Sequence, residues 1–225
     1  MRVNLPDRNF FIGKPIPTRP DVDVREWIAS GNNAHIYRGY SESLQRDLAC
    51  KIIPRANLLY GPDGRELWRE EVQKADILRN TTVVKFLDIQ QWKDDAAKVD
   101  CVVLLSEFVD GPSLRSFVKQ NPDSIDVYFI VHWLETMLNL FHEMKLRSIE
   151  HGDIHTGNIL VEDRSSYNLL PPRYVFRVTD FGVADATSDS RFKDDYLQLA
   201  HILAARGESR AGGRWFLVER DRHYE

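Results

Sequence analysis

The stretch that decides the fold of this chain is residues 151–160, with the sequence HGDIHTGNIL, and it is followed by residues 179–182, with the sequence TDFG. Three acidic or amide side chains stand in these two stretches, namely Asp153, Asn158 and Asp180. Phosphoryl transfer needs a carboxylate that accepts the hydroxyl proton, and oxygen ligands that hold Mg²⁺ against the nucleotide phosphates. Asp153 fits the first of these roles, and Asn158 and Asp180 fit the second.

The residues around these side chains predict how they come together. Residues 159–161 are apolar and predict a short buried strand, and residues 175–178 predict its hairpin partner. A hairpin of these two segments would bring Asn158 and Asp180 to one end of the pair.

In this order, the two stretches resemble the catalytic loop and the metal-binding loop of the protein-kinase-like superfamily. The resemblance implies an ATP- and Mg²⁺-dependent phosphotransferase with an α+β, two-lobed fold. Residues 1–107 would form an N-lobe with an antiparallel sheet and one helix. Residues 108–225 would form a reduced, mostly helical C-lobe that carries the catalytic and metal-binding loops.

The upstream half supplies the Lys and Glu that such a fold requires. Residues 47–53, DLACKII, resemble the family's Lys strand, and Lys51 would contact the α- and β-phosphates. Residues 66–78 have helical apolar spacing. Residues 80–84 resemble the family's link from this helix to the next strand, and counting back from it indicates Glu71 as the partner of Lys51. Glu70 and Glu66 remain open as alternatives.

Residues 27–39 resemble the glycine-rich loop that covers the phosphates. Only Gly31 matches the three-glycine pattern, because Ala29 and Ala34 stand at the other two places. Small residues let backbone N–H groups approach the anions, so these substitutions predict a stiffer loop. Asn32 and Asn33 tolerate turn conformations, and a plain hairpin is therefore the alternative interpretation.

Residues 101–114 predict a buried strand, an extended linker and a helix that starts after Ser113. The segment resembles the family's hinge, where the backbone of Glu107 to Val109 would pair with the adenine edge. Ser106 is smaller than the residue usual at its place and would leave space behind the adenine. The nucleotide-binding residues that the resemblance implies are Gly31, Asn32, Asn33, Ala34, Ile36, Ala49, Lys51, Ser106, Glu107, Val109 and Leu160.

The departures from the family are informative as well. Gly152 stands in place of the usual Arg, and His155 replaces the Lys that touches the γ-phosphate. We expect His155 to act at the catalytic site, although an unperturbed His is mostly uncharged at neutral pH. The loop also resembles that of aminoglycoside-type small-molecule phosphotransferases. Asp195 follows Asp180 closely, which leaves little room for an activation segment and predicts a reduced substrate platform.

Composition agrees with one intracellular globular chain. The 225 residues have 43% hydrophobic content and a net charge of −4. The sequence has no basic stripe of the kind that would predict nucleic-acid binding. We expect no membrane segment, a cytoplasmic location and two reduced, buried cysteines.

Residues 125–144 predict the main C-lobe helix, and residues 14–20 predict a proline-rich loop. Core positions expected on the helix are Ile130, Leu134, Met137, Leu138 and Phe141.

The function expected from these residues is that of a minimal Ser/Thr protein kinase. A small-molecule phosphotransferase and a nucleotide-binding pseudokinase scaffold are the two alternatives. The expected partners are a protein substrate and an activating or completing partner protein.

Overall fold

The computed structural model describes residues 6–31, 33–58, 66–78, 81–165 and 173–181. The chain forms two compact units. The first comprises Met1–Val72 and Lys85–Phe108, and the second comprises Gln73–Val84 and Val109–Glu225. The boundary that we expected after residue 107 stays a prediction, since the contacts also group residues 73–84 with the second unit.

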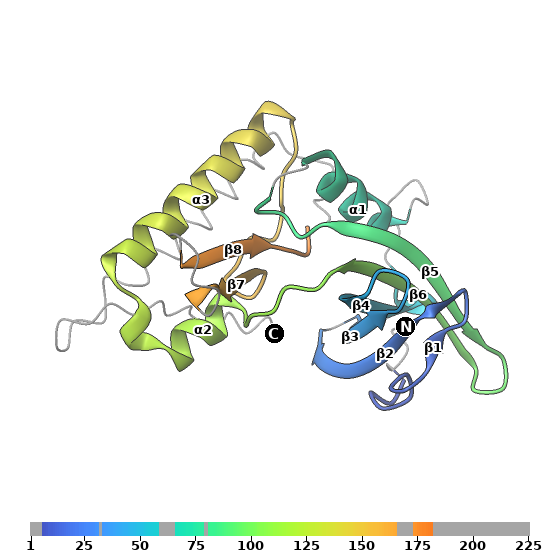
Figure 1. Cartoon of the computed structure of the whole chain (residues 1–225). Coiled ribbons are helices and arrows are strands. Elements are labelled where there is room, and N and C mark those ends of the chain that lie inside the picture. The colour runs from blue at the N-terminus through green and yellow to red at the C-terminus, as the bar shows by residue number, and fades with distance from the viewer. Residues whose placement is uncertain (1–5, 32, 59–65, 79–80, 166–172, 182–225) are drawn as a thin grey trace, which may run out of the picture. The chain divides into compact units, whose positions relative to one another are not determined.

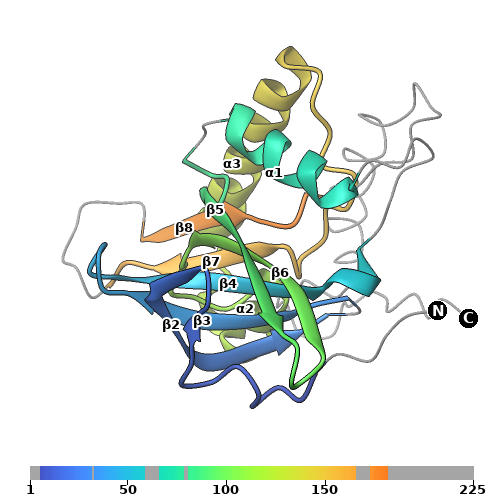
Figure 2. The same cartoon turned by 90° about the vertical axis from the view of Figure 1, so that its right-hand side faces the viewer.

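The first unit is built on a six-stranded antiparallel sheet in the order β1-β2-β3-β4-β6-β5. Figure 1 shows β5 and β6 as its long green hairpin, and in Figure 2 β2, β3 and β4 run side by side. A single 3₁₀ turn, Arg55–Asn57, follows β4. The strands are β1 (Pro15–Ile16), β2 (Arg19–Ser30), β3 (His35–Ser41), β4 (Arg46–Pro54), β5 (Phe86–Asp94) and β6 (Val99–Glu107).

The two faces of this sheet carry different cores. Side chains alternate between the faces of a strand, and β4 shows this clearly. Cys50 and Ile52 join a cluster with Phe11 and Tyr37, whereas Ile53 joins a smaller cluster with Trp68. Trp68 belongs to helix α1 (Leu67–Leu78), which forms where residues 66–78 predict a helix. The helix and the chain preceding β1 therefore lie on opposite faces.

The prediction of a loop over residues 14–20 was wrong, because β1 lies within it and β2 begins within it. Pro15 lies in β1, the edge strand, and Pro20 precedes the part of β2 that pairs with β3. Proline is tolerated at such positions because no ladder hydrogen bond is required of its missing N–H.

Within the part that the structure describes, the second unit contains three further helical segments and a two-stranded sheet. Ser113 caps α2 (Leu114–Gln120), as expected, because its Oγ accepts a hydrogen bond from the Ser116 N–H at 3.3 Å. After a 3₁₀ turn (Pro122–Ser124), Asp126 caps α3 (Val127–Leu146) through the Phe129 N–H at 2.7 Å. The antiparallel pair β7 (Ile159–Asp163) and β8 (Tyr174–Val178) confirms the hairpin predicted beside Asn158.

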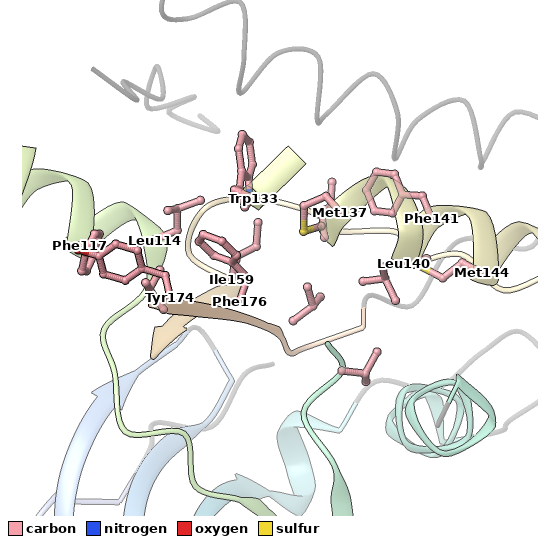
Figure 3. Packing of buried hydrophobic residues seen from close by; sticks show 14 of the residues in the cluster. Leu114, Phe117, Trp133, Met137, Leu140, Phe141, Met144, Ile159, Tyr174 and Phe176 are labelled. Atoms are coloured by element: carbon pink, nitrogen blue, oxygen red, sulfur yellow. The ribbon is translucent and has the colours of Figure 1, made fainter. Parts of the chain in front are cut away.

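The core of the second unit joins α3 to the β7–β8 pair. Figure 3 shows Phe117 and Tyr174 side by side at one end of this cluster, with ring centroids 5.3 Å apart. Met137 and Phe141 are buried as expected, but Leu138 is 49% exposed and its assignment to the core was wrong. Successive helical residues turn by about 100°, which places Leu138 about 160° from Leu140 and away from the buried face. The buried face of α3 consists of Phe129, Trp133, Met137, Leu140, Phe141 and Met144.

The predicted α+β class is confirmed, with an antiparallel sheet in the first unit and mostly helical structure around a small hairpin in the second. Cys50 and Cys101 are buried free thiols, and burial raises the pKa of each to about 12. Among the described residues no helix is both long and apolar enough to cross a membrane.

Candidate active site

One face of the first unit's sheet collects four of the side chains proposed to bind nucleotide. The register pairs Ile36 with Lys51, and Ala49 with Ser106. Directly opposed residues share a face, and positions two apart on β4 share it as well. Ile36, Ala49, Lys51 and Ser106 therefore line one face, the face on which Trp68 and α1 pack.

An ion pair links this face to α1. Lys51 Nζ lies 2.9 Å from Glu71 Oε1, and both side chains are about three-quarters buried. The carboxylate in contact with Lys51 is thus that of Glu71, the expected partner. The pair extends the Lys51 side chain across the sheet face and fixes the position of its ammonium group.

The hairpin between β2 and β3 is the segment that resembles the glycine-rich loop. The Gly31 N–H donates to the Ala34 carbonyl at 2.9 Å and closes the turn. Ala34 is buried in the α1-side core, and the stiffer loop expected from its side chain stays a prediction. A Cβ built on Gly31 meets no atom within 4 Å, and Asn33 is half-buried. Asn32 lies outside the described residues.

The segment that resembles the hinge follows β6. The Glu107 N–H donates to the Lys85 carbonyl at 2.9 Å, while Glu107 Oε1 accepts from the Lys85 N–H at 2.7 Å. This pairing occupies the backbone donor of Glu107, so within the proposed adenine contact Glu107 would contribute its carbonyl.

In the second unit, the linker that begins at Val109 crosses β7 at close range. The Val161 N–H donates to the Pro112 carbonyl at 2.9 Å, and a Cβ on Gly111 would lie 2.0 Å from the Val161 carbonyl oxygen. Only glycine allows this approach. Leu160, proposed to contact the nucleotide, lies half-buried on β7 beside this crossing and forms an isolated bridge with Ser113.

The catalytic loop is organised by the buried side chain of His151. Its Nδ1 accepts the Asp153 N–H at 3.3 Å, and its Nε2 lies 3.1 Å from the Thr179 carbonyl. A carbonyl can only accept, so Nε2 carries the proton and the ring is neutral. Burial lowers the pKa of His151 to about 4, which agrees with this neutral form. His151 therefore connects the backbone of the catalytic loop to the strand end that precedes Asp180.

Asn158 makes the second connection between the same segments. Its Nδ2 donates to the Asp153 carbonyl at 3.0 Å, and its own carbonyl accepts the Thr179 N–H at 3.0 Å. Because the amide nitrogen faces the loop backbone, Oδ1 is the atom that can serve a cation. Asp180 is half-buried and has a φ of 57°, in the left-handed region.

Asp153 itself is open to solvent, with 60% of its side chain exposed. His155 lies beside it, with Nε2 3.7 Å from Asp153 Oδ2. Nδ1 of His155 accepts the Gly157 N–H at 2.9 Å, so the proton of this ring is on Nε2. A Cβ on Gly157 would lie 2.7 Å from His155 Cε1, so a larger residue at this position would displace the ring.

Sequence reasoning missed the parts played by Thr179 and Gly152. The Thr179 carbonyl accepts from His151 Nε2, and the Thr179 N–H donates to the Asn158 carbonyl. These are backbone groups, which residue type does not reveal. Gly152 has a φ of 80°, where other residues are strained, and a glycine before Asp153 was the available signal. Asp195 and the short activation segment lie outside the described residues.

Comparison with known proteins agrees with this geometry. Residues 22–201 match the protein kinase domain family. A probable serine/threonine-protein kinase of Clostridium acetobutylicum is 23% identical over 167 residues, which are 74% of this chain and 23% of that protein. The probable serine/threonine-protein kinase PknB of Corynebacterium glutamicum is 26% identical over 165 residues, 72% of this chain and 23% of that protein. This chain thus spans about a quarter of the length of these relatives, and the match over residues 22–201 shows that it belongs to the protein kinase domain family.

Proposed function

We propose that this chain transfers the γ-phosphoryl group of ATP, with Mg²⁺, to a Ser or Thr hydroxyl of a protein. The observation that carries the proposal is the double connection between the catalytic loop and Thr179, made by His151 and Asn158. It fixes the backbone on both sides of the proposed base and the proposed metal ligands. Family membership supports the kinase class, and the names of the relatives support Ser/Thr specificity.

The residues of the chain fit Mg²⁺. Oxygen ligands from one amide and one carboxylate suit this hard cation. Oδ1 of Asn158 is turned away from the Asp153 carbonyl by the hydrogen bond of Nδ2, and Asp180 supplies the carboxylate. When bound there, Mg²⁺ would neutralise the charge on the phosphate oxygens.

Asp153 would orient the substrate hydroxyl and accept its proton. Its exposed carboxylate can reach a hydroxyl presented by another protein, while its backbone N–H is held by His151. Lys51, held by Glu71, would attract the α- and β-phosphates. Gly31, Asn32, Asn33 and Ala34 would cover the phosphates with the hairpin backbone. His155 would act beside Asp153 as a neutral donor, in place of a cationic Lys.

A small-molecule hydroxyl is the second candidate acceptor. The His155 ring stacked over Gly157 supports it, because these two residues carry the resemblance of the loop to aminoglycoside-type phosphotransferases. A nucleotide-binding pseudokinase scaffold is the third candidate. The whole protein's substrate, an activating or completing partner and a cytoplasmic location belong to the same proposal, since the relatives are much longer than this chain.

One experiment separates these candidates. The purified chain is incubated with γ-labelled ATP and Mg²⁺, with and without a cell extract, and the label is followed into protein and small molecules. We expect label in protein Ser or Thr, and none with Asp153→Asn. Label in a small molecule alone would favour the second candidate. Nucleotide binding without any transfer would favour the scaffold.

A further inference from the structure

The chain that precedes β1 contacts the proposed phosphate-covering hairpin on the sheet face opposite α1. Residues 6–13, the N-terminal strap, lie on the sheet face opposite α1. Phe11 of the strap is fully buried, and its ring packs edge-on against Tyr37 at 5.7 Å and Trp92 at 4.9 Å between centroids. A kinase-type nucleotide site on the α1 face makes no use of these contacts, so they need another explanation.

Two side chains of β3 hold the backbone of the strap. His35 Nε2 lies 2.9 Å from the Pro6 carbonyl, and the Tyr37 hydroxyl donates to the Arg8 carbonyl at 3.0 Å. His35 is the first residue of β3, directly after the hairpin turn. Because strand residues alternate, His35 and Tyr37 face the strap while Ile36 between them faces the proposed nucleotide side.

The contact continues into the other strand of the hairpin. Trp27 Nε1 donates to Ser30 Oγ at 3.2 Å, and Ser30 Oγ lies 2.6 Å from His35 Nδ1. Since the Pro6 carbonyl can only accept, His35 donates through Nε2. The Arg8 guanidinium lies 5.1 Å from the centroid of the Trp27 ring, so the strap contacts both strands.

We propose that the N-terminal strap holds the β2–β3 hairpin in its nucleotide-binding position, with His35 and Tyr37 as positioning residues. The inference rests on the proposed function, in which this hairpin covers the phosphates. Two of the three glycine places in the hairpin are Ala29 and Ala34. The strap supports this hairpin from its outer face through the contacts of His35 and Tyr37.

Reciprocity makes the proposal testable. If the strap favours the nucleotide-binding position, nucleotide must in turn favour the bound strap by the same factor. Amide hydrogen exchange is measured on the full chain with and without a non-hydrolysable ATP analogue and Mg²⁺, while a fluorescent analogue reports nucleotide binding. In the wild type we expect exchange at Phe10 and Gly13 to slow together with that of hairpin residues 30–36.

The test variant is Tyr37→Phe, which keeps the ring against Phe11 and removes only the hydroxyl. Its matched control is Tyr40→Phe on the same strand, whose hydroxyl donates to Gln45 at 3.3 Å and not to the strap. Without nucleotide, Tyr37→Phe should speed exchange in both strap and hairpin by roughly fivefold, the value of one hydrogen bond. Tyr40→Phe should leave both unchanged.

Each outcome of these measurements either supports the proposal or overturns it. Faster exchange in the strap alone with Tyr37→Phe, or slowing by nucleotide in the hairpin alone, would overturn the proposal. If the wild type binds no nucleotide, the proposed function fails. Even then, spread of faster exchange from strap to hairpin would support the strap as the element that fixes the hairpin, and its absence would overturn it. His35→Leu is the second variant, expected to have the same effect by removing the contact with Pro6.

Discussion

The catalytic loop and the β2–β3 hairpin are both short segments proposed to meet the nucleotide, but different parts of the chain fix them. In the loop, the side chains of His151, His155 and Asn158 bond the backbone of the loop itself or of Thr179. In the hairpin, His35 and Tyr37 bond the backbone of the distant strap. Substitutions in the loop should therefore act locally, whereas the hairpin should respond to changes far from it.

The largest effect is expected from the two carboxylates of the second unit. Asp153→Asn should reduce turnover by roughly a thousandfold or more and leave nucleotide affinity nearly intact, because only the proton acceptor is lost. Asp180→Asn should also weaken Mg²⁺-dependent nucleotide binding. Steady-state kinetics and nucleotide titrations with and without Mg²⁺ measure this difference. Wild-type turnover in both variants would show that the loop is not the active site.

In the first unit, Lys51→Ala should lower turnover by roughly a hundredfold without unfolding the chain. Glu71→Ala should cost roughly tenfold, since Lys51 keeps its charge but loses its fixed position. Glu70→Ala is the matched control, one position along the same helix, where a side chain points about 100° away. A silent Glu71→Ala beside a damaging Glu70→Ala would contradict the role given to the ion pair.

The buried His151 should make the second unit sensitive to acid. Burial lowers its pKa from 6.5 to about 4, with smaller contributions from Lys74 and His155 in the same direction and from Asp180 and the Thr179 hydrogen bond against it. The unfolded chain binds the proton below pH 6.5 and the folded chain only near pH 4. The unfolding free energy should therefore fall by roughly 3 kcal/mol as the pH drops through this window.

Urea unfolding at a series of pH values measures this loss. His151→Leu is the control, and its unfolding free energy should have a flatter pH dependence between 6.5 and 4, whatever its absolute stability. Equal slopes in the two proteins would show that another group causes the acid sensitivity.

Ser106 tests the nucleotide face of the first unit. A purine analogue with a bulky apolar substituent could bury roughly 100 Å² beside Ser106, or about 2.5 kcal/mol and seventyfold in affinity before ordering costs. Ser106→Phe should remove this gain and leave ATP affinity almost unchanged. Equal analogue affinity in both proteins would mean that Ser106 does not line the nucleotide site.

The smallest effect contrasts two glycines, one in each region. Gly157→Ala places a methyl group 2.7 Å from the His155 ring, so the ring must move, at a cost of about 1–3 kcal/mol in unfolding free energy. Gly31→Ala meets no atom within 4 Å and should leave stability nearly unchanged. Chemical denaturation of both variants gives the comparison. A more destabilising change at Gly31 would mean that the hairpin is packed more tightly than the loop.

The catalytic loop could be recognised from the sequence because its characteristic residue types stand at fixed spacing within one short segment. Glu71 could be identified as the partner of Lys51 from helical spacing and from the resemblance of residues 80–84 to the family's link between helix and strand. The strap could not be predicted, because the partners of Phe11 lie on β3 and β5 and no local periodicity connects them. Leu138 was misassigned because an apolar residue next to a buried one still fits a loose helical pattern.

The left-handed backbone at Asp180 sets the stability of the fold against the function proposed for this residue. A non-glycine residue at a φ of 57° costs roughly 1–2 kcal/mol, and Gly at this position would relieve that strain. The same substitution would remove the carboxylate proposed to hold Mg²⁺. The stability that Asp180→Gly would gain is therefore set against the loss of that proposed ligand.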